Sequence, residues 1–267
     1  IRDHLDIGRP DQVMLIFDRR LNRSAAGPFR TRVLTEGVDP TLRLSRQSAE
    51  RILPVIMPAV QPSTVIDVGC GVGTWLAVLA ESGVADVWGK DGEYIDRALL
   101  QIPQERFLPH DLTMPIDLER RFDLVLCLEV AEHLPADSAP TLVDSLVSLG
   151  PVILFSAAIP YQGGTHHVNE QWPEYWARLF AARGYAPVDY VRRQIWQLDD
   201  VQWYYAQNIL LFVDRGYLNT NSFLRCRIGK RRQSHVCGLS VGGVRSEDFG
   251  RPNRRISSSM GRERQRR

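Results

Sequence analysis

Long apolar runs are missing from this 267-residue sequence, and none approaches the ~18 residues that a membrane-spanning helix needs. The four cysteines form no CxxC pair, a usage that suits the reducing cytoplasm. No basic segment followed by an apolar core opens the chain, so we expect no signal peptide and interpret Ile1 as a trimmed or partial start. These absences favour a cytoplasmic protein without a membrane span.

Lysine is also scarce, since only two of the 33 basic residues are lysines, and the positive charge is unevenly placed. Residues 216–267 carry 13 basic and 3 acidic side chains, whereas residues 1–215 carry 20 basic and 28 acidic ones. The C-terminal stretch is rich in Gly and Ser and poor in apolar residues, a composition that indicates a disordered basic tail. Nucleic acid would be a partner only through phosphate contacts with this tail.

Between these ends, short apolar segments alternate with helical patterns. Strands are expected at 64–68, 85–89, 106–108, 122–128, 151–156, 185–193 and 207–213, with helices at 45–60, 74–81, 94–100, 138–149 and 173–183. The last two strands show no helical period between them and predict a terminal hairpin that adds an antiparallel edge strand. The pattern predicts an α/β fold with a doubly wound, mainly parallel seven-stranded sheet. We expect this domain to cover 41–215, between a poorly defined leader, 1–40, and the basic tail, 216–267.

Three glycines follow the first predicted strand, at Gly69, Gly71 and Gly73. This G-x-G-x-G spacing differs from the G-x-G-x-x-G of dinucleotide sites, and no lysine follows as a phosphate-binding loop requires. An acid, Asp67, precedes the first glycine by two residues, where it would repel a pyrophosphate and attract a cation. The loop therefore predicts a nucleoside ligand with positive charge, and S-adenosylmethionine (SAM), with its sulfonium and ammonium groups, fits this description.

Residues 65–75 resemble the first motif of the class I SAM-dependent methyltransferases, and other motifs of that family follow in order. Asp91 matches the acid that binds the ribose hydroxyls, Asp111 matches the acid that receives the adenine amino group, and residues 122–134 resemble the fourth-strand motif. The resemblance covers about residues 45–213 and implies the Rossmann-like methyltransferase fold with SAM as cofactor. It implies a cofactor site formed by Asp67, Gly69, Cys70, Gly71, Gly73, Trp75, Asp91, Gly92, Asp111, Leu112 and Glu129.

Methyl transfer depends on an acceptor lone pair positioned in line with the methyl group, and a hydroxyl acceptor also benefits from a base. Substrate binds beyond the carboxyl ends of parallel strands, which places the residues after the fourth and fifth predicted strands near it. The expected catalytic residues there are His133, His166, His167 and Glu170. Aromatic side chains concentrated in the C-terminal third suit a sugar ring, and the sequence also resembles bacterial methyltransferases of glycan and secondary-metabolite type. We therefore expect a hydroxyl of a small molecule or glycan as the acceptor, with no metal.

Two alternatives remain open. Glu129, Glu132, His133 and His167 form a carboxylate-and-imidazole set suited to Mg²⁺ or Mn²⁺. This set resembles the metal site of the small-RNA 3′-terminal 2′-O-methyltransferases, which implies a metal-dependent RNA 2′-O-methyltransferase. The other alternative is a non-catalytic protein that keeps the cofactor fold and binds a partner. The acceptor atom, the oligomeric state and the roles of residues 1–40 and of the tail are not determined by the sequence.

Overall fold

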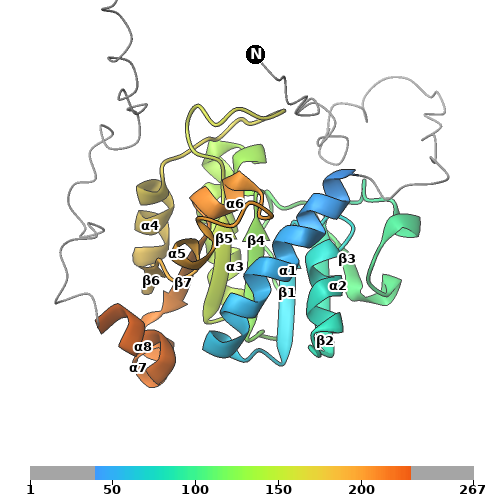
Figure 1. Ribbon diagram of the computed structural model, residues 1–267. Coiled ribbons are helices and arrows are strands. Elements are labelled where there is room, and N and C mark those ends of the chain that lie inside the picture. The colour runs from blue at the N-terminus through green and yellow to red at the C-terminus, as the bar shows by residue number, and fades with distance from the viewer. Residues whose placement is uncertain (1–39, 230–267) are drawn as a thin grey trace, which may run out of the picture. The chain divides into compact units, whose positions relative to one another are not determined.

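The computed structural model describes residues 40–229, with side chains described for 41–225 (Figure 1). The expected leader, except for its last residue, and the part of the expected tail at 230–267 lie outside the described residues. The fold below belongs to a unit that ends at Arg225. No helix in the described part combines the length and the apolar character that crossing a membrane requires.

One seven-stranded sheet organises this unit, in the order β3-β2-β1-β4-β5-β7-β6. The pairs among β1 to β5 are all parallel, while β7 is antiparallel to both β5 and β6. The predicted doubly wound, mainly parallel α/β sheet is confirmed. The strands are β1 (Thr64–Val68), β2 (Asp86–Asp91), β3 (Phe107–Pro109), β4 (Leu124–Leu128), β5 (Val152–Ser156), β6 (Tyr185–Val188) and β7 (Leu210–Asp214).

The position of the antiparallel strand differs from the prediction. The last two strands, β6 and β7, pair antiparallel as predicted, but the antiparallel strand β7 is inserted between β5 and β6 and is not at the edge, which β6 forms. Residues Leu210–Val213 of β7 are buried, as expected for a strand with a neighbouring strand on each side and helices on both faces of the sheet. The connection from β6 to β7 also contains two short helices, α5 (Arg192–Ile195) and α6 (Trp203–Asn208), which are too short to show a helical period in the sequence.

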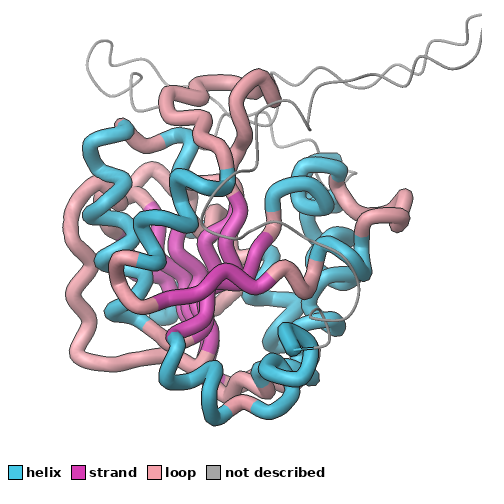
Figure 2. The backbone as a smooth tube through the Cα atoms, turned by 90° about the vertical axis from the view of Figure 1, so that its left-hand side faces the viewer, coloured by secondary structure: helices cyan, strands magenta, loops and turns pink. Residues whose placement is uncertain are grey.

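Helices cover both faces of the sheet, which lies between them in Figure 2. One face packs against α1 (Pro40–Val60) and α2 (Thr74–Glu81), where Ile52, Leu53 and Leu76 are fully or almost fully buried in one core cluster. The other face packs against α3 (Ala139–Leu149) and α4 (Pro173–Ala181), whose core includes Phe180 stacked on Phe212 of β7 at 3.9 Å between ring centroids. Single turns of 3₁₀ helix complete the unit at Arg97–Leu99, Gln104–Arg106, Ala131–His133 and Ala136–Ser138.

Helices continue beyond residue 215, where the basic tail was expected to begin. Two helices follow β7 directly, α7 (Arg215–Thr220) and α8 (Ser222–Gly229). Leu224 is fully buried, and the Asn221 side-chain amide donates a hydrogen bond to the Ala59 carbonyl at the end of α1 (2.9 Å). The few apolar residues of 216–267 lie at the start of this segment, so the average composition of the whole segment did not indicate a folded part.

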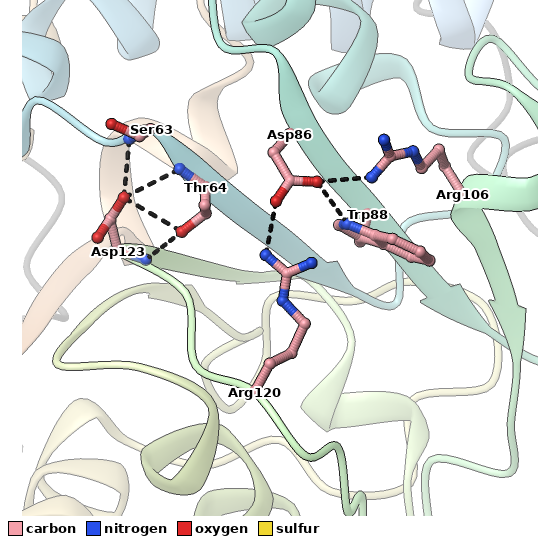
Figure 3. Close-up of polar contacts among 7 residues, drawn as sticks. All are labelled: Ser63, Thr64, Asp86, Trp88, Arg106, Arg120 and Asp123. Carbon is pink, nitrogen blue, oxygen red and sulfur yellow. Dashed lines mark hydrogen bonds and ion pairs between the residues drawn. The ribbon is translucent and has the colours of Figure 1, made fainter.

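A polar network stabilises the sheet at the amino end of β2, away from the carboxyl ends of the strands (Figure 3). The Asp86 carboxylate accepts hydrogen bonds from Trp88 Nε1 (2.7 Å), Arg106 (2.6 Å) and Arg120 (2.5 Å). These contacts, of which the one to Arg120 is the largest cause, lower the pKa of Asp86. The Arg106 guanidinium also lies over the Trp88 ring, 4.6 Å from its centroid. The network therefore joins the segments on either side of β3 to β2.

Candidate active site

The glycine loop after β1 has a backbone that only glycine adopts readily. Gly69, Gly71 and Gly73 have φ values of 86°, 53° and 83°, in the left-handed region. A Cβ at Gly69 would lie 2.2 Å from Val130 Cγ2, so the loop packs closely against the segment after β4. A Cβ at Gly71 would have no atom within 4 Å. The middle of the loop is thus open to a ligand, while its base is fixed by packing.

Asp91, the last residue of β2, lies against this loop. Its carboxylate accepts hydrogen bonds from the Gly71 N–H (2.8 Å), the Gly92 N–H (2.6 Å) and the Tyr94 hydroxyl (2.5 Å). Burial raises the pKa of Asp91, although these three donors oppose that effect. Tyr94 was not predicted from the sequence; its ring occupies the place that a Cβ on Gly92 would need, with Tyr94 Cε1 only 1.9 Å away. The structure therefore brings the predicted acid and the predicted loop into direct contact.

Asp67, in β1, is the other acid beside the loop. It is 3% exposed, and burial, followed by repulsion from the Asp91 carboxylate, raises its pKa to about 7. A cation bound next to Asp67 would relieve this cost. Cys70 is buried as well, and the Trp75 ring meets Tyr205 edge-on at 5.2 Å between centroids. Asp67, Cys70 and Trp75 thus lie within the segment that contains the glycine loop or next to it.

The residues expected to contact adenine follow β3 at the same edge of the sheet. The Asp111 carboxylate is exposed and accepts hydrogen bonds from the Thr113 N–H (3.0 Å) and hydroxyl (2.7 Å), while Leu112 is buried. The His110 N–H donates to the Asp91 carbonyl (2.7 Å), which ties this segment to the end of β2. Asp111 and Asp91 are thus held on neighbouring segments at the carboxyl edge.

A second polar cluster lies beyond the ends of β4 and β5. Ligand atoms of Glu132, His133 and His167 all lie within 4.8 Å of one another. Glu132 is fully buried, and its carboxyl group is hydrogen-bonded to that of Glu129. The rings of His133 and His167 meet edge-on, with centroids 4.9 Å apart. We refer to these three residues as the Glu132 cluster.

The loop between β5 and α4 delivers His167 to this cluster. The Val168 and Asn169 N–H groups both donate to the Glu132 carbonyl, at 2.9 and 3.0 Å. Glu170 Oε1 lies 2.9 Å from His167 Nδ1, and its Oε2 accepts a hydrogen bond from the Tyr161 N–H (2.9 Å). If His167 Nδ1 carries the proton of this contact, the ring leaves Nε2 with a lone pair.

Burial dominates the electrostatics of the cluster. The pKa of Glu132 is raised well above its ordinary value by burial and by the nearby charge of Glu129. The pKa of His133 is lowered to about 4 by burial and, next, by His167. His133 is therefore a neutral imidazole near pH 7.

Two residues predicted for this site, Glu129 and His166, are not members of the Glu132 cluster. Glu129 has a left-handed φ of 53°, and its carboxylate accepts hydrogen bonds from Asn208 Nδ2 (3.2 Å) and Gln162 Nε2 (3.3 Å). Three of the four expected metal ligands form the Glu132 cluster, and Glu129, besides contacting these two amides, is hydrogen-bonded to the Glu132 carboxyl. His166 is exposed and does not belong to the cluster. Gln162 and Asn208 were missed, because no spacing relates them to Glu129 in the sequence.

The strand order with an antiparallel β7, a glycine loop after β1 and a buried acid after β2 define the class I SAM-dependent methyltransferases with a Rossmann-like fold. Residues 41–185, more than half of the chain, match the family described as methyltransferase domain. The chain therefore belongs to this family.

Curated relatives support the family. The chain is 36% identical over 94 residues to magnesium-protoporphyrin O-methyltransferase of Synechocystis sp., covering 32% of this chain and 39% of that protein. It is 31% identical over 171 residues to trans-aconitate 2-methyltransferase of Azoarcus sp., covering 60% and 61%. The matches thus span less than two thirds of either relative. Among solved structures, magnesium protoporphyrin IX methyltransferase of Synechocystis with bound SAH is similar, at 21% identity and a TM-score of 0.49, covering 67% of this chain and 89% of that one.

Proposed function

We propose that this methyltransferase transfers the SAM methyl group to a hydroxyl of a small molecule or of a sugar in a glycan. The support is the position of the Glu132 cluster beside the glycine loop. Gly69 packs against Val130, which lies between Glu129 and the 3₁₀ turn that carries Glu132 and His133. A methyl donor held by the loop would therefore be close to the cluster.

The residues around the loop fit SAM in shape and charge. Gly71 leaves open space where a side chain would otherwise stand, and Asp67 is a buried carboxylate that a cation would stabilise. We assign Asp67, the glycine loop and Asp91 to holding the cofactor, with Asp111 and Leu112 at its adenine end. When bound there, SAM supplies a methyl group already activated by its sulfonium.

A hydroxyl acceptor explains the composition of the cluster. An alcohol is a weak nucleophile until its proton is withdrawn, and the Glu132 cluster gathers one carboxylate and two imidazoles at the carboxyl edge of the sheet. The observation that carries the proposal is the contact of Glu170 with His167 Nδ1, which orients the ring; with the proton of this contact on Nδ1, Nε2 would be the nitrogen that accepts the proton of a hydroxyl. The Synechocystis relative is named an O-methyltransferase, which also favours an oxygen acceptor.

The test uses SAM labelled in the methyl group, incubated with the purified protein and separate fractions of small metabolites, glycans and RNA. We expect label in hydroxyl-bearing metabolites or glycans, stable to alkali as an ether is. Label confined to RNA would instead support the 2′-O-methyltransferase alternative, whose basic contacts are expected from the tail, 216–267, of which residues 230–267 lie outside the described residues. Label found only on nitrogen or carbon would refute the proposal.

A further inference from the structure

We propose that Trp203 and Tyr204 of α6 bind a neutral pyranose ring of the acceptor, next to the side-chain amide of Gln162. The inference rests on the proposed function, because it names the kind of hydroxyl compound that this site takes. It assigns the binding of that ring to the connection between β6 and β7, which lies outside the methyltransferase motifs of the sequence.

Helix α6 lies near the carboxyl ends of β4 and β5 (Figure 1). At the C-terminal end of the helix, Asn208 Nδ2 donates to Glu129 Oε1 (3.2 Å), directly after β4, and to Gln162 Oε1 (2.8 Å), in the loop after β5. Tyr205 of the same helix meets Trp75 edge-on, at 5.2 Å between ring centroids. Because Trp75 is the second residue of α2, directly after the glycine loop, α6 contacts both the cofactor side and the acceptor side of the site.

Four aromatic rings form a series that leads from the glycine loop to the surface. Beyond the contact of Trp75 with Tyr205, the ring centroids of Tyr205 and Tyr204 are 4.6 Å apart, and those of Tyr204 and Trp203 are 5.8 Å apart. Trp75 and Tyr205 are buried, Tyr204 is half-buried, and Trp203 is 58% exposed. The Tyr205 hydroxyl is hydrogen-bonded to Ser45 of α1 and to Trp75. The two inner rings of this ring series are therefore fixed, and the two outer rings are accessible to a ligand.

Polar side chains lie next to the outer rings. Burial raises the pKa of Tyr204, and the nearby charge of Glu129 raises it further, which shows that the phenol and the carboxylate are close. Gln162 Nε2 donates to Glu129 Oε2 (3.3 Å), and Gln162 Oε1 accepts from Gln207 Nε2 (3.4 Å). Amides and carboxylates are hydrogen-bond partners for hydroxyl groups, whereas aromatic rings cover apolar surface. Both kinds of group thus meet where α6 faces the loop after β5.

A pyranose ring has both of the matching surfaces. In its chair form it presents a flat face of C–H groups, which an aromatic ring can cover, and an edge of hydroxyl groups, which amides and carboxylates can bind. An acyclic polyol has the hydroxyl groups without a rigid apolar face, and a phenol has the face with few hydroxyl groups. Residues 1–215 carry 28 acidic and 20 basic side chains, so a polyanionic acceptor would be repelled. The site therefore favours a neutral sugar ring.

The experiment measures contact with the ring without any methyl transfer. Full-length protein saturated with S-adenosylhomocysteine is mixed with the methyl pyranosides of glucose, galactose, mannose and rhamnose. Saturation-transfer NMR, with irradiation of aromatic protons, reports which ligand C–H groups lie against aromatic side chains. Sorbitol is the acyclic comparison probe, and phenol is the planar one. We expect transfer to the ring C–H groups of at least one pyranoside, stronger than the transfer to sorbitol or phenol.

Variants then locate the contact. Trp203→Ala should weaken binding of that pyranoside about threefold to tenfold, and Trp203→Phe, which keeps a ring, should recover part of the loss. Trp196→Ala is the matched control, because Trp196 is 62% exposed on the same connection between β6 and β7 but takes no part in the ring series. This control should bind the pyranoside as the parent does. Calorimetry with S-adenosylhomocysteine checks that each variant keeps the folded cofactor site.

The absence of transfer to every pyranoside, or a stronger signal on sorbitol or phenol, would overturn the sugar site. Unchanged binding by folded Trp203→Ala, or an equal loss in Trp196→Ala, would also overturn it, because binding would then not depend on the ring series. Methyl transfer to a hydroxyl of sorbitol or phenol, and to no pyranoside, would overturn the sugar site and leave the proposed function standing. Pyranoside binding that depends on Trp203, with label only on nitrogen or carbon, would refute the hydroxyl acceptor and retain the site.

Discussion

Replacing Asp67 with asparagine should stabilise the ligand-free protein at pH 8 and weaken its binding of SAM. Burial and the neighbouring Asp91 raise the pKa of Asp67 from an ordinary 3.8 to about 7. At pH values between these two pKa values, the Asp67 carboxyl is protonated in the folded state and ionised in the unfolded state. The stability of the parent protein therefore falls as the pH rises from about 4 to about 7 and loses nothing more from this group above that range.

The size of the effect follows from the difference between the two pKa values. The pKa difference of about three units corresponds to about 4 kcal/mol, which is the most by which Asp67 can lower the free energy of unfolding at pH 8. The asparagine variant lacks this titration, so its free energy of unfolding should exceed that of the parent at pH 8. The gap should shrink toward pH 5. Urea denaturation at several pH values measures this directly.

The ionised form of Asp67, which destabilises the ligand-free protein, should have the opposite effect on SAM binding. SAM brings positive charge to the loop, so the ionised form of Asp67 should favour binding, and calorimetry of the parent should show affinity that rises from pH 6 to pH 8. Asp67→Asn should bind SAM more weakly at pH 8 and with little dependence on pH. If the variant were no more stable than the parent at pH 8 and kept the same pH dependence of SAM affinity, Asp67 would not be the buried titrating group beside the cofactor.

Further predictions concern the loop, the cluster and the C-terminal helices. Asp91→Ala should lower SAM affinity about tenfold or more in calorimetry, because charge-assisted hydrogen bonds contribute about 1.5–3 kcal/mol each; unchanged affinity would remove Asp91 from the site. Gly69→Ala should lower the melting temperature, since its Cβ would lie 2.2 Å from Val130 Cγ2 and its φ of 86° strains any other residue; a normal melting curve would contradict that packing. His167→Ala should depress turnover while leaving S-adenosylhomocysteine affinity unchanged, and parental turnover would exclude it from the reaction. Leu224→Ala should cost about 2–5 kcal/mol in urea denaturation, because the side chain is fully buried; a cost near zero would place α8 outside the folded unit.

Much of the cofactor side was predictable because its signals are local. Gly69, Gly71 and Gly73 follow β1 as expected and have a left-handed backbone, and the Asp91 carboxylate accepts a hydrogen bond from the Gly71 N–H. The surroundings of the Glu132 cluster were only partly predictable: the sequence grouped Glu129 with it, but did not show that Asn208 and Gln162 hydrogen-bond to Glu129. These partners lie far along the chain, and nothing in the composition marks them.

The sequence by itself determined the alternation of apolar strands and helices, the glycine loop and the acids next to it, because backbone preference and side-chain periodicity act over a few residues. Only the tertiary structure decided that β7 enters between β5 and β6, that His167 lies beside Glu132, and that Leu224 belongs to the core. Those outcomes depend on which surfaces pack together across the whole sheet. That choice is made by burial of side chains distant in sequence, and no short stretch of the chain contains it.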